Sequence, residues 1–245
     1  MIDLEFRGER DEIGVLRINR EERRNALDQE HCDGLREGVT KAVASGARVL
    51  VITGAGTSFC SGADLDQVYG DAFTQALYAA LHAITDAPIP VIAAVNGPAI
   101  GAGTQLALAA DLRVAAPKAI FGVPTARLGL AVDPWTLRRL ALLAGGGTAR
   151  AMVLGCENLA AERALELGLV QRIGDLDAAL AWAAEIAKLA PLTLAYSKRT
   201  LNATLEPPFS DPAVDEALRA CWTSEDAQEG RRAREEKRPP VFQGK

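Results

Sequence analysis

The residues best suited to chemistry lie in two glycine-rich turns, at 54–62 and 97–103, each after an apolar run that predicts a buried strand. The second turn opens an apolar helix in GAGTQLALAAD, residues 101–111. Backbone N–H groups at a helix start lack intrahelical partners and lie at the positive end of the dipole. With a second amide from FCSGADL, residues 59–65, they would polarise a carbonyl group. The alternative is that the glycines only permit tight packing of strand against helix.

Several other kinds of site have no support in the sequence. There is no GxSxG, HExxH or P-loop pattern, and neither glycine-rich turn fits GxGxxG. His31 and His82 lie on predicted helices and are expected to be structural. The four cysteines lie far apart without a CxxC pair, which predicts no metal site and a reducing cytoplasm. A formal charge of −5 with dispersed basic residues argues against binding to nucleic acid.

The segments that must position these turns alternate between strand and helix. Alternating residues before and after Asp11 predict two strands, and residues 27–44 predict a helix with Asp28 as its N-cap. This strand and helix cycle then repeats, which predicts an α/β fold with ligand chemistry in the loops after the strands. The chain becomes mostly helical after residue 145. We therefore expect an α/β core over residues 1–190 and a helical segment over residues 191–245.

The uncharged stretch 87–110 is long enough to cross a bilayer. Its prolines and glycines would break a helix repeatedly in lipid, so we expect a buried strand, a loop and a helix instead of a membrane span. The N-terminal residues lack the apolar core of a signal peptide.

The sequence resembles the crotonase, or enoyl-CoA hydratase/isomerase, family in five segments that follow the family's order and cover nearly the whole chain. They are NREERRNAL (19–27), GTSFCSGADL (56–65), NGPAIGAGTQLALAADLRVAA (96–116), FGVPTARLGL (121–130) and SEDAQEGRRAREEKRPPVF (224–242). The resemblance implies a crotonase (ClpP-like) spiral core of repeated ββα units, with the acyl-CoA site in residues 1–190. It also implies that residues 191–245 assemble a homotrimer or a dimer of trimers.

The resemblance implies particular residues for the ligand, a coenzyme A thioester, and no resident cofactor or metal. The family holds the thioester oxygen with two backbone amides, which match those of Ala63 and Ala102. Alanine at 102, where the family usually has glycine, keeps the N–H group. The implied CoA-binding residues are Arg23, Arg24, Ala26, Ser61, Ala63, Asp64 and Leu65, with Lys237 reaching CoA from a neighbouring subunit. Ordinary surface charge is the alternative for the basic residues.

The sequence departs from the hydratases at the two positions where they carry catalytic glutamates. Gln105 and Thr125 stand there, and neither side chain transfers a proton usefully near neutral pH. Each acid–base group is worth ~10²–10⁴ in rate, so hydratase turnover is predicted to be weak or absent. This chain therefore resembles a bacterial branch in which both glutamates are replaced.

Asp133 is the one carboxylate that the resemblance brings near the thioester. It matches a position at which dienoyl-CoA isomerases and an aroyl-CoA dehalogenase carry a functional aspartate. The alternative is that Asp133 caps a helix that starts at Pro134.

The leading hypothesis is a cytoplasmic protein of fatty-acid and lipid metabolism that binds a fatty acyl-CoA and serves a protein partner in lipid synthesis as carrier, donor or sensor. The alternative hypothesis is an active enoyl-CoA hydratase, or another acyl-CoA lyase or isomerase that uses Asp133.

Overall fold

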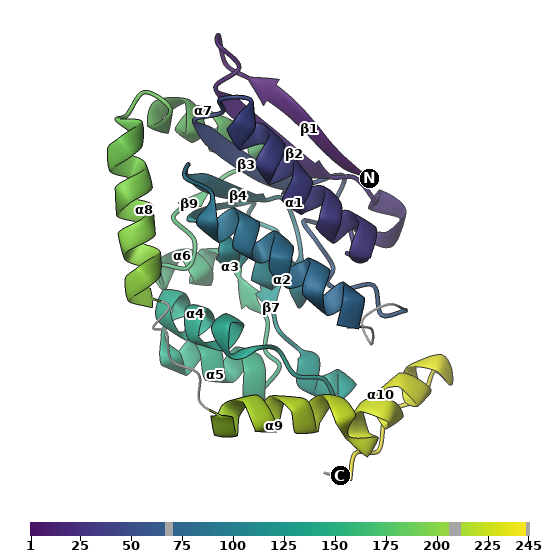
Figure 1. Ribbon diagram of the computed structural model, residues 1–245. Helices are drawn as coiled ribbons and strands as arrows, with labels where there is room; N and C mark the ends of the chain where they lie inside the picture. Colours follow the sequence, from purple (N-terminus) through teal and green to yellow (C-terminus); the bar gives the residue numbers. More distant parts are fainter. Residues whose placement is uncertain (67–70, 206–211, 244–245) are drawn as a thin grey trace.

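The computed structural model describes residues 1–66, 71–205 and 212–243. Its large sheet has six strands in the order β1-β2-β3-β4-β6-β9 (Figure 1). The strands are β1 (Ile2–Arg7), β2 (Ile13–Ile18), β3 (Val49–Gly54), β4 (Val91–Val95), β6 (Leu112–Ala115) and β9 (Arg172–Ile173). Among the described strands of this sheet, only β1 and β2 pair antiparallel, and every residue of β3 and β4 is buried. Such uninterrupted apolar strands are typical of a parallel sheet covered on both faces.

A second, smaller sheet consists of β5 (Ala99–Ile100), β7 (Ile120–Gly122) and β8 (Leu159–Ala160). The chain passes from β4 in the large sheet to β5 in the small one and then into α3 (Ala102–Ala109). It repeats this path from β6 to β7. The structure therefore confirms the predicted spiral of ββα units, in which each step brings a turn to the same edge.

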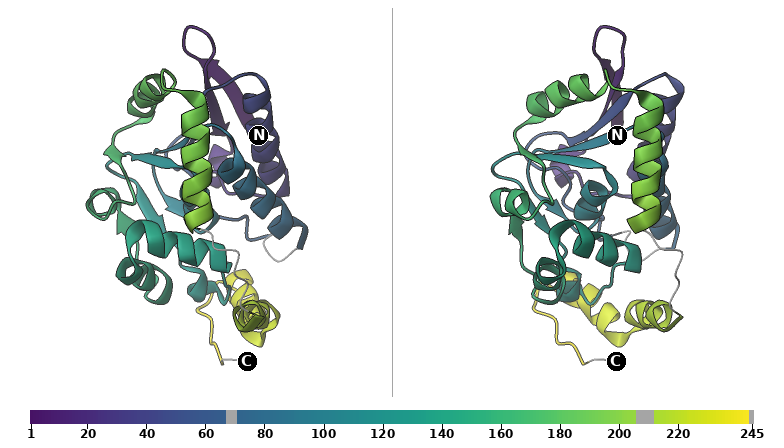
Figure 2. Two further views of the ribbon diagram at one scale, coloured as in Figure 1. Left: turned by 60° about the vertical axis from the view of Figure 1, so that its left-hand side comes forward. Right: turned by 90° about the vertical axis from the view of Figure 1, so that its left-hand side faces the viewer.

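Helices cover both faces of the large sheet. On one face lie α1 (Gln29–Ala44) and α2 (Asp71–Asp86), side by side, and on the other lies α7 (Leu176–Ile186) (Figures 1 and 2). The side chains of β2 alternate between these layers, as the pleat of a strand requires. Leu16 and Ile18 pack in the cluster under α1 and α2, whereas Ile13 and Val15 pack in the cluster with α7.

The predicted elements around the site are present, with one adjusted boundary. Asp28 caps α1 by accepting the His31 N–H at 2.9 Å, but the helix begins at Gln29 and not at Leu27. Leu27 is instead held in a parallel bridge with Ala63. The stretch 87–110 forms β4, β5 and α3, and all eight residues of α3 are buried.

No single described helix is long and apolar enough to cross a membrane. Among the described helices, α7 and the following residues 191–203 pass that test as a pair, by length and composition, and the two are bent by 113° where they join.

The remaining helices come from the second half of the chain. They are α4 (Pro134–Ala144), α5 (Gly146–Leu154), α6 (Ala161–Glu166), α8 (Pro191–Leu205), α9 (Pro212–Thr223) and α10 (Glu225–Glu235). The buried ammonium of Lys198 fixes α8 to the core, because it donates to Ile84 O at 2.9 Å and pairs with Asp111 at 2.9 Å. Helices α9 and α10 lie at the end of the molecule farthest from the β1–β2 turn (Figures 1 and 2). The predicted role of residues 191–245 in oligomerisation stays a prediction.

Candidate functional site

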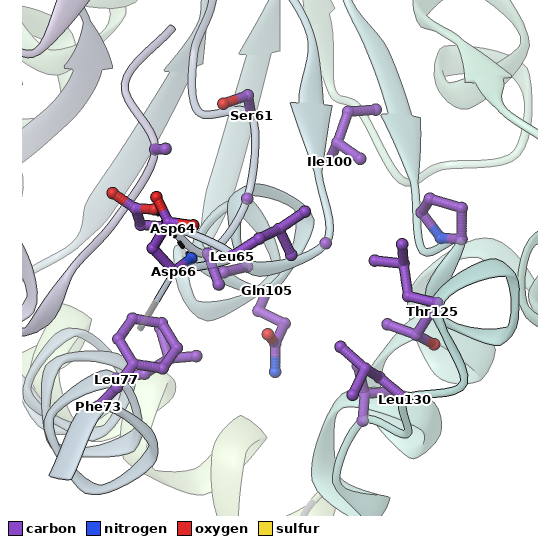
Figure 3. Close-up of a pocket in the computed structure, with 18 of the residues that line it drawn as sticks. Ser61, Asp64, Leu65, Asp66, Phe73, Leu77, Ile100, Gln105, Thr125 and Leu130 are labelled. Atoms are coloured by element: carbon purple, nitrogen blue, oxygen red, sulfur yellow. Dashed lines mark hydrogen bonds between the residues drawn. The ribbon is translucent and has the colours of Figure 1, made fainter. Parts of the chain in front are cut away.

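Both glycine-rich turns open into one cavity of about 410 Å³. Residues of α2, α3, α10 and the short helix η2 (Thr125–Leu128) complete its walls. Figure 3 shows Gln105 reaching into the space between Phe73 and Leu77 on one side and Thr125 and Leu130 on the other. The cavity therefore combines an apolar interior with a small number of polar groups, as sites for small ligands commonly do.

Backbone hydrogen bonds hold the two turns together. The Cys60 N–H donates to Pro98 O at 3.1 Å, and the Ile100 N–H donates to Cys60 O at 3.0 Å. A Cβ atom at Gly103 would lie 2.1 Å from Cys60 O, so the close approach requires glycine there. Tight packing and a role in the site are therefore not exclusive explanations for these glycines. The close contact that requires glycine also brings both turns to the cavity.

The amides of Ala63 and Ala102 are the two predicted oxyanion donors, and both residues line the cavity. Each follows a glycine in the left-handed region, Gly62 at φ +115° and Gly101 at φ +54°. Within the described ranges, neither amide donates a backbone hydrogen bond. Ala102 is also the first residue of α3, at the positive end of the helix dipole. Two available donors at such a place can bind a partly negative carbonyl oxygen.

Gln105 lies one turn further along α3 and is only 4% exposed. Its amide nitrogen donates to Thr136 Oγ1 at 2.8 Å and to Asp133 Oδ2 at 3.2 Å. Thr125, the other predicted position, begins η2 and also lines the cavity. The structure thus brings Gln105, Thr125 and the two amides to one cavity.

Asp133 lies behind this cavity and does not line it. It caps α4, whose first residue is Pro134, by accepting the Thr136 N–H at 3.1 Å, so the helix-cap interpretation is confirmed. Its Oδ2 accepts three more hydrogen bonds, from Thr136 Oγ1 at 2.5 Å, Tyr78 Oη at 3.0 Å and the amide of Gln105. Both carboxylate oxygens of Asp133 are thus already engaged by donors from within the protein.

Tyr78 is a cavity residue that the sequence did not reveal. Burial raises the pKa of Tyr78, and the negative charge of Asp133 raises it further. The hydroxyl therefore keeps its proton and donates it to Asp133. No motif marks Tyr78, because its position on amphipathic α2 is that of an ordinary half-buried residue.

The turn that precedes α1 is shaped by Asn25, another residue that the sequence did not single out as functional. Arg24 and Asn25 are both left-handed, at φ 51° and 59°. The fully buried Asn25 side chain accepts from Arg20 N at 3.0 Å and donates to Ala55 O at 2.9 Å and Ser58 O at 2.7 Å. These bonds attach the turn to the loop after β3.

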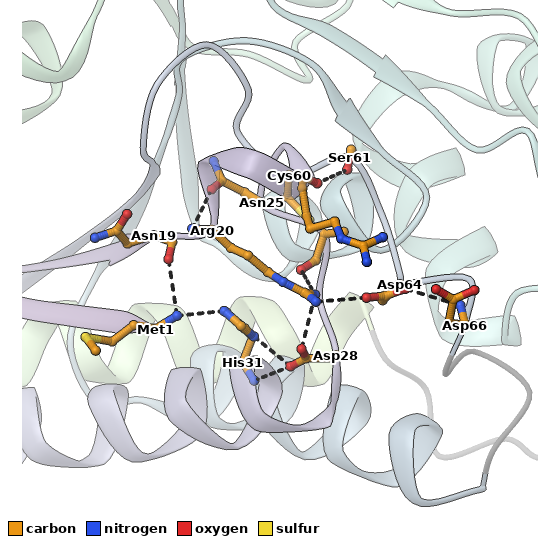
Figure 4. Close-up of polar contacts among 12 residues, drawn as sticks. Met1, Asn19, Arg20, Asn25, Asp28, His31, Cys60, Ser61, Asp64 and Asp66 are labelled. Atoms are coloured by element: carbon orange, nitrogen blue, oxygen red, sulfur yellow. Dashed lines mark hydrogen bonds and ion pairs between the residues drawn. The ribbon is translucent and has the colours of Figure 1, made fainter.

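Arg20 connects this turn with the loop 59–65, which carries the Ala63 amide (Figure 4). Its guanidinium pairs with Asp28 at 3.1 Å and with Asp64 at 3.0 Å. Burial would raise the pKa of Asp28, but hydrogen bonds from His31 and the charge of Arg20 outweigh it, and the pKa is lowered. Asp64, predicted to bind CoA, lines the cavity with its carboxylate already paired.

The other residues predicted to bind CoA divide into two groups. Lining the same cavity are Arg23, Arg24, Ala26, Ser61 and Leu65. Lys237 is exposed and does not line the cavity of its own chain, so its contact with CoA bound to a neighbouring subunit stays a prediction. Arg234 of α10, not predicted, does line the cavity and donates to Leu65 O and Asp66 Oδ1, each at 3.2 Å.

Metal ligation finds no support in the part of the chain that the structure describes, and neither do the thiols of Cys32 and Cys60 as nucleophiles. No group of three or more His, Cys, Asp or Glu side chains there could hold a metal ion. Burial raises the pKa of Cys60 to about 12 and also raises that of Cys32, so both thiols stay protonated.

The sequence and the fold of this chain are similar to those of known proteins that act on CoA thioesters by name. The family model described as enoyl-CoA hydratase/isomerase matches residues 8–245. A probable enoyl-CoA hydratase of Mycobacterium tuberculosis, echA6, is 50% identical over 234 residues, which cover 94% of this chain and 95% of that protein. A solved carnitinyl-CoA dehydratase from Mycobacterium avium has a TM-score of 0.84 at 36% identity, with 100% of this chain and 99% of that one covered. A methylmalonyl-CoA decarboxylase in complex with 2-nitronate-propionyl-CoA has the same fold, with a TM-score of 0.91 at 24% identity over 100% and 98% of the chains.

Proposed function

The chain belongs to the enoyl-CoA hydratase/isomerase family, and we propose that it binds a fatty acyl-CoA with weak or absent hydratase turnover. The thioester oxygen lies between the amides of Ala63 and Ala102, and the acyl chain enters the apolar part of the cavity. Two of its relatives, a probable enoyl-CoA hydratase and a carnitinyl-CoA dehydratase, are both named for CoA thioesters, which supports this class of ligand.

One observation carries the proposal: the cavity keeps its two carbonyl-binding amides without the two catalytic glutamates, and the carboxylate of Asp64, which also lines it, is paired with Arg20. Gln105 and Thr125 face the cavity where a hydratase would carry its two glutamates. Asp133, the carboxylate that contacts the amide nitrogen of Gln105, is occupied by four donors. Binding therefore retains its main interaction, whereas general acid–base catalysis loses ~10²–10⁴ for each missing group.

We propose a location, an assembly and a partner for the protein as well. It acts in the cytoplasm in fatty-acid and lipid metabolism, without a resident cofactor, as a homotrimer or hexamer. It passes or presents its acyl-CoA to a protein partner in lipid synthesis. Arg23, Arg24 and Ala26 hold CoA with the loop from Ser61 to Leu65, and Lys237 reaches CoA in a neighbouring subunit.

The second candidate is an active enoyl-CoA hydratase, or another acyl-CoA lyase or isomerase, in which Asp133 acts on the substrate. What favours it is the direct contact of Asp133 with Gln105 at 3.2 Å. Asp133 would then have to exchange one of its present donors for a substrate proton.

The test uses Ala102→Pro, which deletes one proposed oxyanion donor. Proline is tolerated at the first residue of a helix because that N–H has no intrahelical partner. Losing one hydrogen bond of about 0.5–1.5 kcal/mol should weaken acyl-CoA binding about three- to tenfold. Free CoA, which has no acyl carbonyl, should bind the variant and the wild type equally.

Calorimetric titration of both proteins with a long-chain acyl-CoA and with free CoA gives these four affinities. Equal affinity of wild type and variant for the acyl-CoA would contradict the proposed carbonyl site. A variant that loses affinity for both ligands would indicate a distorted loop. The control is Ala102→Gly, which keeps the N–H group and should bind both ligands as the wild type does.

A further inference from the structure

The Ala63 amide, one of the two proposed carbonyl donors, lies in a segment that is bonded on both sides of it. The Leu27 N–H donates to Gly62 O at 2.8 Å, and the Asp64 N–H donates to Leu27 O at 2.6 Å. Leu27 and Ala63 form a parallel bridge, and within the described ranges the Ala63 N–H donates no backbone hydrogen bond. The direction of the Ala63 N–H therefore depends on how its two neighbours are held.

One guanidinium holds the Asp64 side of this segment. Arg20 pairs with Asp28 at 3.1 Å and with Asp64 at 3.0 Å (Figure 4). Asp28 is the N-cap of α1, so the two pairs connect the loop 59–65 with a helix of the core. The three side chains are 16%, 11% and 10% exposed, and salt screens such pairs far less than pairs on the surface. The planar guanidinium suits this place, because its N–H donors form a fixed fork that can reach two carboxylates at once.

Arg20 itself does not line the cavity, whereas Arg23 and Arg24 of the same turn do. The Ser61 N–H donates to Arg24 O at 3.1 Å, so the start of the loop 59–65 is attached to this turn through the backbone. The Arg20 side chain holds the other end of the loop. The turn therefore contributes to the proposed CoA site in two ways, by lining the cavity and by supporting the loop that carries the amide.

The carboxylate of Asp64 is engaged within the protein at both oxygens. Its Oδ2 pairs with Arg20, and its Oδ1 accepts from the Asp66 N–H at 3.2 Å. Resting on the proposed acyl-CoA binding, we infer that Arg20 is a positioning residue that acts through Asp64. It holds the Ala63 amide in the direction of the thioester oxygen without touching the ligand. Displacement of this amide weakens the carbonyl interaction and leaves the contacts with the rest of CoA in place.

The test compares a long-chain acyl-CoA with the S-alkyl-CoA of the same chain length, in which a methylene group replaces the carbonyl. The ratio of the two affinities measures the carbonyl interaction alone. Two hydrogen bonds should make the wild type bind the thioester about ten- to a hundredfold more tightly. Arg20→Met removes the guanidinium and should lower this ratio about three- to tenfold, the share of one hydrogen bond. The loss of positive charge beside Asp28 and Asp64 also weakens binding, but it affects both ligands alike.

Arg23→Met is the matched control, because Arg23 belongs to the same turn and lines the cavity. It should weaken both ligands by the same factor and leave the ratio at its wild-type value. Arg20→Lys keeps the charge but not the fork, so its ratio should lie between those of the wild type and Arg20→Met. Asp64→Asn should also lower the ratio, and adding it to Arg20→Met should lower the ratio no further, because the two residues act as a pair.

Calorimetric titration gives these ratios, and circular dichroism verifies that each variant is folded. If Arg20→Met does not fold, Arg20→Lys and Asp64→Asn decide. Unchanged ratios in these variants, or an equal fall in Arg23→Met, would overturn the inference while leaving the proposed function standing. Equal affinity of the wild type for the thioester and the S-alkyl compound would instead overturn the proposed carbonyl site and the inference with it.

Discussion

At the scale of single residues, Asp133 is the position on which the two candidate functions differ. Sequence reasoning left it as a helix cap or a catalytic group. The structure shows the cap and adds three donors on the second oxygen, which turn Asp133 into the anchor of Tyr78, Thr136 and Gln105. Its effect on a ligand is then indirect, through the orientation of Gln105.

Substitution of Asp133 should reveal this structural role in stability. Asp133→Ala removes the cap and leaves Tyr78 and Thr136 without their acceptor, so the free energy of unfolding should fall by about 1–2 kcal/mol. Asp133→Asn keeps the cap and should lose clearly less. Urea unfolding of both variants measures the difference, and equal stability of Asp133→Ala and the wild type would contradict the anchor role.

The residues at the site differ in how far the sequence could predict them. Gln105 and Thr125 stand out because they occupy fixed places in motifs, and both line the cavity. Tyr78 and Arg234 belong to no motif and reach the cavity only because α2 and α10 pack beside it. Their contribution depends on contacts between distant segments, which local periodicity does not encode.

At the scale of elements, the turn before α1 is part of the proposed CoA site. Its consecutive left-handed residues, Arg24 and Asn25, are compensated by the three hydrogen bonds of the Asn25 side chain. The strands and the helix around this turn follow from hydrophobic patterns. The conformation of the turn does not, because it depends on the partners of one buried side chain.

Two substitutions at Asn25 should separate conformational strain from hydrogen bonding. Asn25→Gly removes the three bonds but suits the left-handed backbone, and should cost about 1–3 kcal/mol of unfolding free energy. Asn25→Ala should cost about 1 kcal/mol more, because alanine resists that conformation. Urea unfolding gives both values, and titration with free CoA should show weaker binding to both variants. An alanine variant as stable as the glycine variant would argue against the strained turn.

The C-terminal end of α10 depends on one carboxylate. Glu229 accepts from Arg238 at 2.5 and 3.0 Å and from Val241 N at 3.0 Å. These bonds, that from Arg238 above all, lower the pKa of Glu229 to about 2 from its ordinary value of 4.5. Because the folded-state pKa is depressed, the stabilisation is present above pH 4.5 and is lost as the pH falls towards about 2.

Glu229→Gln at neutral pH imitates that protonation, and amide hydrogen exchange over residues 236–243 should become faster. The matched control is Glu235→Gln, which breaks only an exposed pair with Arg231 on the same helix. Exchange in this segment that is unchanged in Glu229→Gln, or equally accelerated in the control, would contradict the role of Glu229.

At the scale of the whole molecule, the spiral core explains why segments far apart in the sequence make one site. Each ββα step returns the chain to the same edge, so residues from turns at 20–26, 59–65 and 97–103 meet there. This arrangement was predictable from the order of the motifs. The assembly of several chains was predictable only through resemblance, since its contacts involve surfaces that one chain leaves exposed.

The apolar surface of α8 is consistent with such an assembly. Leu192, Tyr196 and Leu201 are 85%, 70% and 61% exposed in the single chain. We expect sedimentation equilibrium to give three or six times the mass of one chain. Apolar contacts are not screened by ions, so the mass should persist as the salt concentration is raised. A monomer at all protein concentrations would contradict the proposed trimer or hexamer.

The central claim is that this protein binds a fatty acyl-CoA without turning it over as a hydratase does. The most direct test measures, on one sample, calorimetric binding of a long-chain acyl-CoA and the rate of crotonyl-CoA hydration. We expect saturable binding with hydration at the background rate. Hydration well above background that Asp133→Asn abolishes, with acyl-CoA binding intact, would contradict binding without turnover and favour catalysis by Asp133.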